Sequence, residues 1–359
     1  MYGGGKIPTM KPDRKYFLIL ALIALILTSL ACAGSTPTDE PKISTATSEQ
    51  QEIVEPEQPE EEIVEEPAEQ PADVPTALPT DTPEPEPQFL GDVTEDFGYL
   101  LSAVNIEDPA KPGMFYTPES GKKLVAVEII VGVSSGDPLS VNPLGTVFLD
   151  SEGFSYQAEL GGVDNQLATV DISTGEKVQG WVAFSIPEEA TPSSIKYSID
   201  LFGDAEIKVN LEQPPEGHVA DTSALSIVPP EPDSKLGDTY EQFGYSLTAM
   251  GSEDPATPGM LYTPRTGYKL VAVDIIVSNE SGESHTVNPL NSVLVDSNGY
   301  VYTTELGGRD DQIATLDISS GEKVRGWVSF TIPEDASPYT VKYLVDMFTS
   351  NYLITGLVE

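Results

Sequence analysis

The chain has 359 residues, and its 58 acidic and 18 basic side chains give a net charge of −40 at pH 7. A surface this acidic repels anionic polymers, so we expect no nucleic-acid partner. The chain has one cysteine and two histidines, which excludes an intramolecular disulfide and a zinc site built from cysteine and histidine.

Residues 1–31 are typical of a secretory signal, because basic residues precede an apolar run at 16–27. This run is shorter than the roughly 20 residues that a membrane-spanning helix needs. It ends at Cys32, and a lone cysteine at this place resembles the lipobox of bacterial lipoproteins, with Ser29 where that family usually has leucine. The resemblance implies cleavage before Cys32 and a membrane anchor through its lipidated sulfur. The alternative is ordinary cleavage after Ala33, which would release a soluble protein.

Residues 32–89 are mainly threonine, serine, proline and glutamate. Such a segment has too few large apolar side chains to form a core, and proline and like charges extend it. We expect a disordered acidic linker. It either holds the folded part of the protein away from a membrane or is an unstructured tail without a selected length.

Residues 90–211 recur at 236–357 with a constant offset of 146 positions and no insertion or deletion. A period of this length corresponds to a whole domain, because solenoid repeats are much shorter. We therefore expect two copies of one domain, called repeat 1 (90–212) and repeat 2 (236–359). The proline-rich segment 213–235 is interpreted as a linker and a flexible joint.

Each repeat shows the alternation of β-strands. The run 123–131 is rich in β-branched residues and predicts a long buried strand. Segments 146–149 and 154–156 flank a glycine-containing turn at 150–153, which predicts a hairpin.

In the predicted strand 180–187, alternate residues Val182, Phe184 and Ile186 share a face that we assign to the core. A further strand is expected at 194–200. No long amphipathic helix is indicated, so the pattern favours an antiparallel β-sandwich.

In order, the Lys-Leu-Val-Ala-Val strand, the Asp-Ser-x-Gly hairpin and the Gly-Glu-Lys-Val-x-Gly-Trp-Val segment resemble a known family. It is the telokin-like, immunoglobulin-like domain of unknown function found in bacterial surface lipoproteins. The resemblance implies an extracytoplasmic immunoglobulin-like sandwich and no established catalytic residues. The expected fold class is therefore all-β, with two tandem immunoglobulin-like antiparallel β-sandwiches after the signal peptide and the linker.

The histidines do not indicate a nucleophilic enzyme. His218 lies in the segment between the repeats, and His285 has Leu139 as its counterpart in repeat 1. A general base must be held next to its nucleophile, and no such pair recurs in both copies. We predict a protein that is not an enzyme and that needs no cofactor.

Two loops recur in both repeats and are candidate sites. The Glu-Leu-Gly-Gly loops at 159–166 and 305–312 offer hard oxygen ligands, but they lack the alternating spacing of an EF-hand loop. We favour a structural turn and no metal. The weak calcium candidates are Glu159, Asp164, Glu305, Asp310 and Asp311.

The second pair is the Pro-Gly-Met loops at 107–118 and 253–264, where three prolines prevent a regular strand. Apolar side chains on such a loop form either a partner-binding surface or a plug that folds back over one end of the sandwich. The plug is favoured. The candidate binding residues are Met114, Phe115, Tyr116, Met260, Leu261 and Tyr262.

These features predict a non-enzymatic, surface-anchored lipoprotein that binds or adheres to an extracellular or envelope partner. We expect it outside the cytoplasm, anchored at a bacterial cell surface, or else secreted as a soluble protein. A structural spacer or shield of the envelope is the main alternative. A calcium-dependent or carbohydrate-acting protein is a less favoured one.

Overall fold

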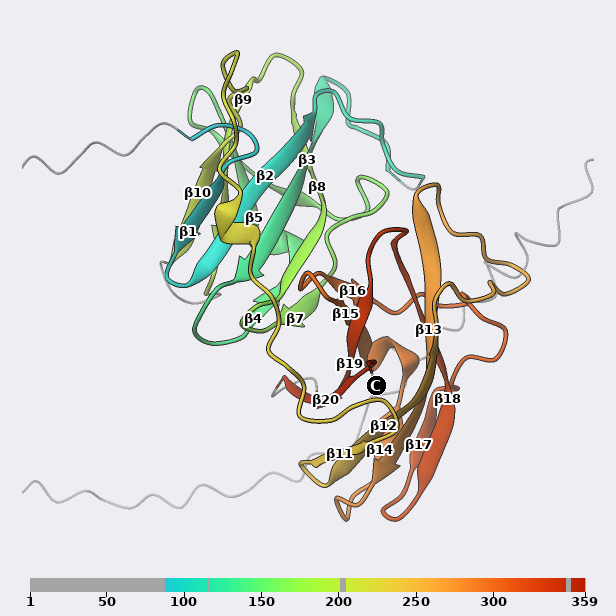
Figure 1. Ribbon diagram of the computed structural model, residues 1–359. Helices are drawn as coiled ribbons and strands as arrows, with labels where there is room; N and C mark the ends of the chain where they lie inside the picture. The colour runs from blue at the N-terminus through green and yellow to red at the C-terminus, as the bar shows by residue number, and fades with distance from the viewer. Residues whose placement is uncertain (1–87, 115, 201–204, 347–349, 359) are drawn as a thin grey trace, which may run out of the picture. The chain divides into compact units, whose positions relative to one another are not determined.

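The computed structural model describes residues 88–114, 116–200, 205–346 and 350–358 (Figure 1). The described residues belong to one compact unit. The predictions for the signal peptide, Cys32, residues 32–87 of the acidic linker and Phe115 lie outside the described residues. Within the described ranges, no helix has the length and apolar character to cross a membrane.

All but one of the regular elements in the described part of repeat 1 are strands. They are β1 (Val93–Asp96), β2 (Tyr99–Glu107), β3 (Lys122–Val133), β4 (Leu139–Val141), β5 (Thr146–Asp150), β6 (Ser155–Glu159), β7 (Val170–Ile172), β8 (Lys177–Pro187), β9 (Pro192–Ser198) and β10 (Glu206–Asn210), with the 3-10 helix η1 (Pro143–Gly145) before β5.

Repeat 2 has the same elements in the same order, preceded by the 3-10 helix η2 (Ser223–Leu225) in the segment between the repeats. They are β11 (Thr239–Gln242), β12 (Tyr245–Glu253), β13 (Tyr268–Asn279), β14 (His285–Val287), η3 (Pro289–Asn291), β15 (Ser292–Asp296), β16 (Val301–Thr303), β17 (Leu316–Ile318), β18 (Lys323–Pro333), β19 (Pro338–Asp346) and β20 (Asn351–Gly356).

Both repeats have two antiparallel layers. In repeat 2 the layers are the sheets β11-β12-β13-β18 and β16-β15-β19-β20. In repeat 1 a short β6–β8 ladder joins the corresponding layers, so the order runs β1-β2-β3-β8-β6-β5-β9-β10. The all-β, antiparallel class expected from the sequence is confirmed.

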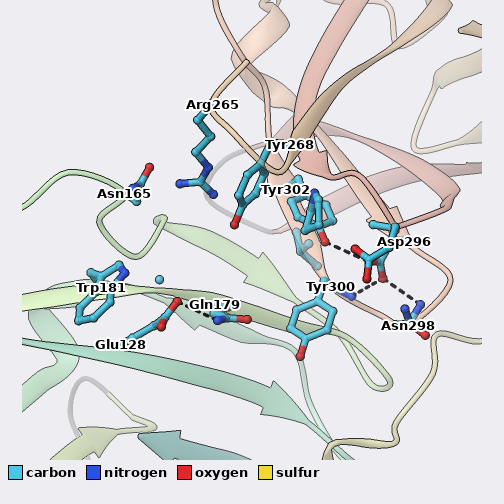
Figure 2. A pocket seen from close by; sticks show the side chains of 15 residues that line it. Glu128, Asn165, Gln179, Trp181, Arg265, Tyr268, Asp296, Asn298, Tyr300 and Tyr302 are labelled. Atoms are coloured by element: carbon cyan, nitrogen blue, oxygen red, sulfur yellow. Dashed lines mark hydrogen bonds between the residues drawn. The ribbon is translucent and has the colours of Figure 1, made fainter. Parts of the chain in front are cut away.

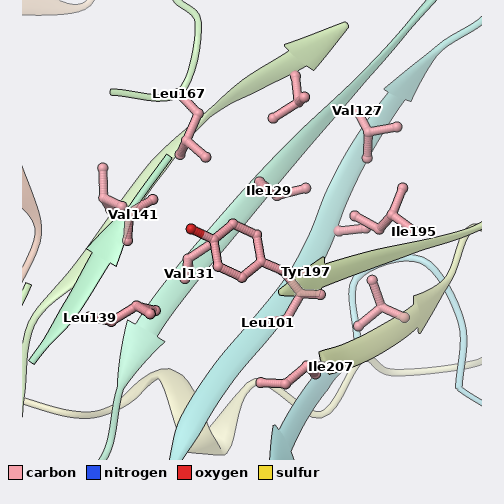
Figure 3. Packing of buried hydrophobic residues seen from close by; sticks show 14 of the residues in the cluster. Leu101, Val127, Ile129, Val131, Leu139, Val141, Leu167, Ile195, Tyr197 and Ile207 are labelled. Atoms are coloured by element: carbon pink, nitrogen blue, oxygen red, sulfur yellow. The ribbon is translucent and has the colours of Figure 1, made fainter. Parts of the chain in front are cut away.

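The core of repeat 1 lies between its two layers (Figure 3). Alternate residues of β8 enter it, and Val182, Phe184 and Ile186 are buried as the sequence predicts. The ring of Phe148 on β5 lies 5.2 Å from that of Phe184 on β8. In repeat 2, the corresponding residues Phe330 and Leu294 are fully buried.

The hairpin predicted at 146–156 is formed by β5 and β6, and one carboxylate organises its turn. Asp150 accepts hydrogen bonds from the backbone N–H of Glu152 and of Phe154, and from the hydroxyl of Tyr156. Burial acts to raise the pKa of Asp150, but these hydrogen bonds outweigh it and hold the pKa below its ordinary value. In repeat 2, Asp296 makes the same three kinds of hydrogen bond.

A buried tyrosine joins β9 to the turn before β5. The backbone N–H of Asn142 donates to the hydroxyl of Tyr197 at 3.0 Å, and that of Asn288 donates to Tyr343 at 3.1 Å. Figure 3 shows the Tyr197 ring among aliphatic side chains of the core. Each hydroxyl therefore satisfies a backbone group that would otherwise lack a partner.

The two repeats make direct contact. Glu176, in the turn before β8, forms an ion pair of 2.7 Å with Lys342 on β19, and both side chains are buried. Val293, Val295 and Val301 of repeat 2 belong to the same buried cluster as the core of repeat 1.

The segment between the repeats also takes part, so the interpretation of a flexible joint is wrong for its described residues. The ammonium of Lys177 donates to the carbonyls of Leu225 and Ile227 in this segment and of Asn298 in repeat 2. All three N–H groups of the ammonium thus have a partner. Burial lowers the pKa of Lys177.

Candidate functional site

In each repeat the two loops that the sequence singles out lie together. The backbone N–H of Gly113 donates to the carbonyl of Gly162 at 2.8 Å, and Gly259 donates to Gly308 at 2.7 Å. We call each pair of loops a loop surface: 107–118 with 159–166 in repeat 1, and 253–264 with 305–312 in repeat 2. Sequence spacing alone could not predict this contact, because the loops are far apart along the chain.

The tips of the loop surfaces are apolar and exposed. Met114 is 85% exposed, Met260 is 88% exposed and Leu261 is 85% exposed. The second loop adds Leu160 in repeat 1 and Leu306 in repeat 2, both more than half exposed. Each repeat therefore presents large apolar side chains to solvent from a loop that is hydrogen-bonded to its neighbour.

Beneath each tip is a small apolar cluster on the outer side of the β2-β3-β8 or β12-β13-β18 layer. In repeat 1, Tyr116 and Trp181 pack partly buried on Ala110, Leu124, Ala126 and Ala183. In repeat 2, Tyr262 and Trp327 pack on Ala256, Leu270 and Ala272. The Tyr262 hydroxyl is also hydrogen-bonded to that of Thr331.

The plug interpretation is thus right for Tyr116 and Tyr262 and wrong for the methionines. The two loops approach closely at Gly113, where an added Cβ would lie 3.1 Å from the Gly161 carbonyl oxygen. The space over the sheet is already filled by the alanine and tyrosine, and Met114 and Met260 lie exposed beyond them.

Charge distinguishes the two loop surfaces. Arg309 of repeat 2, where repeat 1 has Val163, lies with its guanidinium carbon 4.3 Å from the ring centre of Trp327. It pairs with Asp311 at 2.8 Å and also with Glu253. The hydrogen bond with Asp311 raises the pKa of Arg309 and lowers that of Asp311.

The weak calcium candidates do not converge on one point in the part of the chain that the structure describes. No group of three or more histidine, aspartate or glutamate side chains in those ranges is placed to hold a metal ion. Asp311 faces Arg309, and Asp310 accepts from the backbone N–H of Met260 at 3.1 Å. The glycine pair forms a structural turn, in which Gly307 donates to the side-chain carbonyl of Gln312. Glu159, Asp164 and Glu305 join no such group.

A cleft of about 560 Å³ lies beside the contact between the repeats (Figure 2). Repeat 1 contributes Trp181 and the hydrogen-bonded pair Gln179 and Glu128, whereas repeat 2 contributes several aromatic rings. Sequence reasoning missed this cleft, because its walls come from strands of different repeats. The aromatic lining residues from repeat 2 are Tyr268, Tyr300 and Tyr302.

Comparison with known proteins identifies each repeat. The family model of a domain of unknown function (DUF4352) matches residues 95–207 and again 234–353. No curated protein matches the chain.

Three solved structures are similar to parts of the chain. A candidate lipoprotein from Bacillus subtilis (ycdA) is 12% identical over 33% of this chain and 38% of its own, with a TM-score of 0.30. The secreted protein MPT63 of Mycobacterium tuberculosis is 13% identical over 36% of this chain and 98% of its own, with a TM-score of 0.25. An uncharacterised β-sandwich protein from Clostridium difficile is 14% identical over 36% and 97%, with a TM-score of 0.23.

Proposed function

This chain belongs to the DUF4352 family, and from that premise we propose that it is a non-enzymatic binding module that presents two loop surfaces to a protein partner. The observation that carries the proposal is the exposure of Met114, Met260 and Leu261 on loops held by backbone hydrogen bonds. Binding is favoured when a partner removes methionine and leucine side chains from water, because burial of apolar surface lowers the free energy. Methionine is also enriched in protein interfaces.

The site chemistry favours a protein over a polyanion or an anionic membrane. The net charge of −40 opposes both of the latter. Two loop surfaces in one chain allow both to engage a repeated partner, so the second contact forms at a high effective concentration.

We further propose the setting in which this binding takes place. The leader and Cys32 support a lipid-anchored protein outside the cytoplasm, with the acidic linker as a spacer. The repeats are of the immunoglobulin-like type, and the partner is an extracellular or envelope protein. The mass of the mature N-terminus tests the anchor, because a chain that begins at Gly34 would contradict lipidation at Cys32.

The binding proposal is tested with the full chain in a non-ionic detergent and isolated bacterial cell envelopes. Serine replaces Met114, Met260 and Leu261 together. Co-sedimentation is measured as a function of chain concentration. We expect the triple variant to reach half-saturation at a concentration about ten-fold or more above that of the unchanged chain, because each buried apolar side chain contributes about 1.5–3 kcal/mol.

The matched control replaces Leu144 and Leu290 with serine. These leucines are 56% and 55% exposed, lie in the 3-10 helices and belong to neither loop of a loop surface. Binding by the control equal to that of the unchanged chain supports the proposal. Equal binding by the triple variant would contradict it.

A structural spacer is the second candidate, and the contact between the repeats favours it. The buried ion pair of Glu176 and Lys342, with the three hydrogen bonds of Lys177, holds the repeats together. On this alternative, envelope binding is absent or insensitive to the loop substitutions.

A further inference from the structure

The contact between the repeats is head to tail, because it uses different surfaces of the two copies. Repeat 1 contributes the turn 173–178, which we call the docking turn. Repeat 2 contributes the outer side of β15, β16 and β19, which we call the receiving face. The backbone N–H of Lys177 donates to the Gly299 carbonyl at 2.8 Å, and Glu176 pairs with Lys342.

Because the sequence repeats with an offset of 146 positions, the docking turn and the receiving face each occur twice. One copy of each takes no part in the contact between the repeats. The second docking turn is 319–324, in which Glu322 and Lys323 replace Glu176 and Lys177. These two residues are exposed, whereas Glu176 and Lys177 are buried. Beside the turn, Leu316 is 37% exposed, although its counterpart Val170 is only 6% exposed.

The second receiving face is the outer side of β5, β6 and β9 in repeat 1. Its residues Val147 and Leu149 are half-buried, whereas the corresponding Val293 and Val295 are 4% and 0% exposed. Phe154 is 60% exposed at the place where Tyr300 of repeat 2 meets Lys177. The receiving face of repeat 1 thus exposes apolar surface to solvent, whereas the corresponding surface of repeat 2 is covered.

The second docking turn already has the docked conformation. The carboxylate of Glu322 accepts from the backbone N–H of Ser319 at 2.7 Å, as that of Glu176 does from Ser173 at 2.8 Å. The glycine of each turn has almost the same positive φ, 86° at Gly321 and 84° at Gly175. A preformed turn loses little conformational entropy when it binds.

The second receiving face differs from the first at several positions that weaken it. Ser155 stands where repeat 2 has the buried Val301. Lys196, the counterpart of Lys342, is held by Glu206 at 2.5 Å, and repeat 2 has Tyr352 in the place of that glutamate. The carbonyls of Leu225 and Ile227 accept hydrogen bonds from Lys177, and these two bonds have no counterpart in a contact made by Lys323 of another chain. A contact between chains therefore has fewer hydrogen bonds than the contact within one chain, and it depends on concentration.

We propose that the docking turn 319–324 of one chain binds the receiving face of repeat 1 in a second copy. Glu322 then pairs with Lys196 of the next chain, and Leu316 contacts its exposed apolar residues. Because the contact joins different surfaces, a pair of chains still has one free docking turn and one free receiving face. Association therefore continues into open chains or closes into a ring.

The test is sedimentation velocity of the full chain in detergent over a range of concentrations. The unchanged chain is expected to show species larger than the monomer that grow with concentration. Glu322→Lys and Lys196→Glu are each expected to raise the concentration for half-association about ten-fold or more, because each leaves like charges opposed. The double variant E322K/K196E restores the opposite charges between chains and is expected to recover association.

The control is Glu334→Lys, which makes the same charge change at an exposed residue after β18, at the opposite end of that strand from the docking turn. Melting temperatures of all variants show whether each chain is folded. A photo-crosslinker at Leu316 is expected to join residues 147–154 of another chain. A monomer at all concentrations, or association that Glu322→Lys leaves unchanged while Glu334→Lys abolishes it, would overturn the proposal.

Discussion

Lys196 and Lys342 occupy the same position of the repeat and have almost the same neighbours in sequence, but their surroundings differ. Lys196 is part of an exposed pair with Glu206, whereas Lys342 is fully buried and pairs with Glu176 of the other repeat. The local sequence cannot distinguish the two lysines, because the second domain that covers Lys342 comes from distant residues. Alternation, by contrast, correctly predicts Val182 and Phe184 in the core, since a strand buried on one face determines which side chains point inward.

Replacement of Lys342 by methionine is expected to lower the free energy of unfolding by about 3–5 kcal/mol, because it leaves the carboxylate of Glu176 buried without its partner. The loss cannot exceed the free energy that holds the repeats together. The matched variant Lys196→Met removes an exposed ion pair and is expected to cost less than about 1 kcal/mol. Chemical denaturation measures both, and equal losses would contradict the role assigned to the buried pair.

At the scale of elements, the hairpin of β5 and β6 and the long strands β3 and β8 could be predicted, because their signals are local. The loop surfaces could be predicted only in part. Their sequences show proline, glycine and apolar residues, but not the hydrogen bond that joins Gly113 to a second loop or the exposure of Met114 beside it. Short strands such as β4 and β7 carry too few residues for a period to be recognised.

The tyrosines that join β9 and β19 to the preceding turns predict how stability depends on alkaline pH. Burial raises the pKa of Tyr197 and of Tyr343 to about 12, above the ordinary value of 10.0. The folded state therefore retains protons that the unfolded state loses. Their contribution to stability is complete below pH 10 and declines as the pH rises toward 12.

Burial also raises the pKa of Tyr156, Tyr302 and Tyr352. An absorbance titration of phenolate is therefore expected to show several late tyrosines in the folded protein, Tyr197 and Tyr343 among them. Tyr197→Phe removes one of them and leaves the N–H of Asn142 without its acceptor, at a cost of about 1–3 kcal/mol. If Tyr197 titrated together with the exposed tyrosines, its assigned burial would be wrong.

At the scale of the whole molecule, the sequence predicts two domains and a leader, but not that the domains are joined through a packed segment. Proline content suggested a flexible joint. Proline content contains no information about the backbone carbonyls of Leu225 and Ile227, which accept hydrogen bonds from the buried ammonium of Lys177. Backbone acceptors are the same in every sequence, so composition carries no signal for such a contact.

Gly175 provides a test of this packing, and Gly321 provides its control. A Cβ at Gly175 would lie 2.1 Å from the carbonyl oxygen of Val228, whereas at Gly321 nothing lies within 4 Å. Alanine at either position costs about 1–2 kcal/mol in backbone strain, because both have positive φ. Only Gly175→Ala is expected to displace the segment between the repeats and to accelerate its cleavage by a protease. Equal cleavage rates in the two variants would show that the segment is not held at this point.

The docking turn exists in two copies of nearly identical sequence, one covered and one exposed, so the molecule contains its own undocked reference. The amide of Lys177, which donates to Gly299, exchanges its hydrogen with solvent only when the repeats separate. The amide of Lys323 has the same local sequence without the covering domain. Below the concentration at which chains associate, the ratio of the two exchange rates in a single unmodified sample therefore reports the free energy that holds the two repeats together.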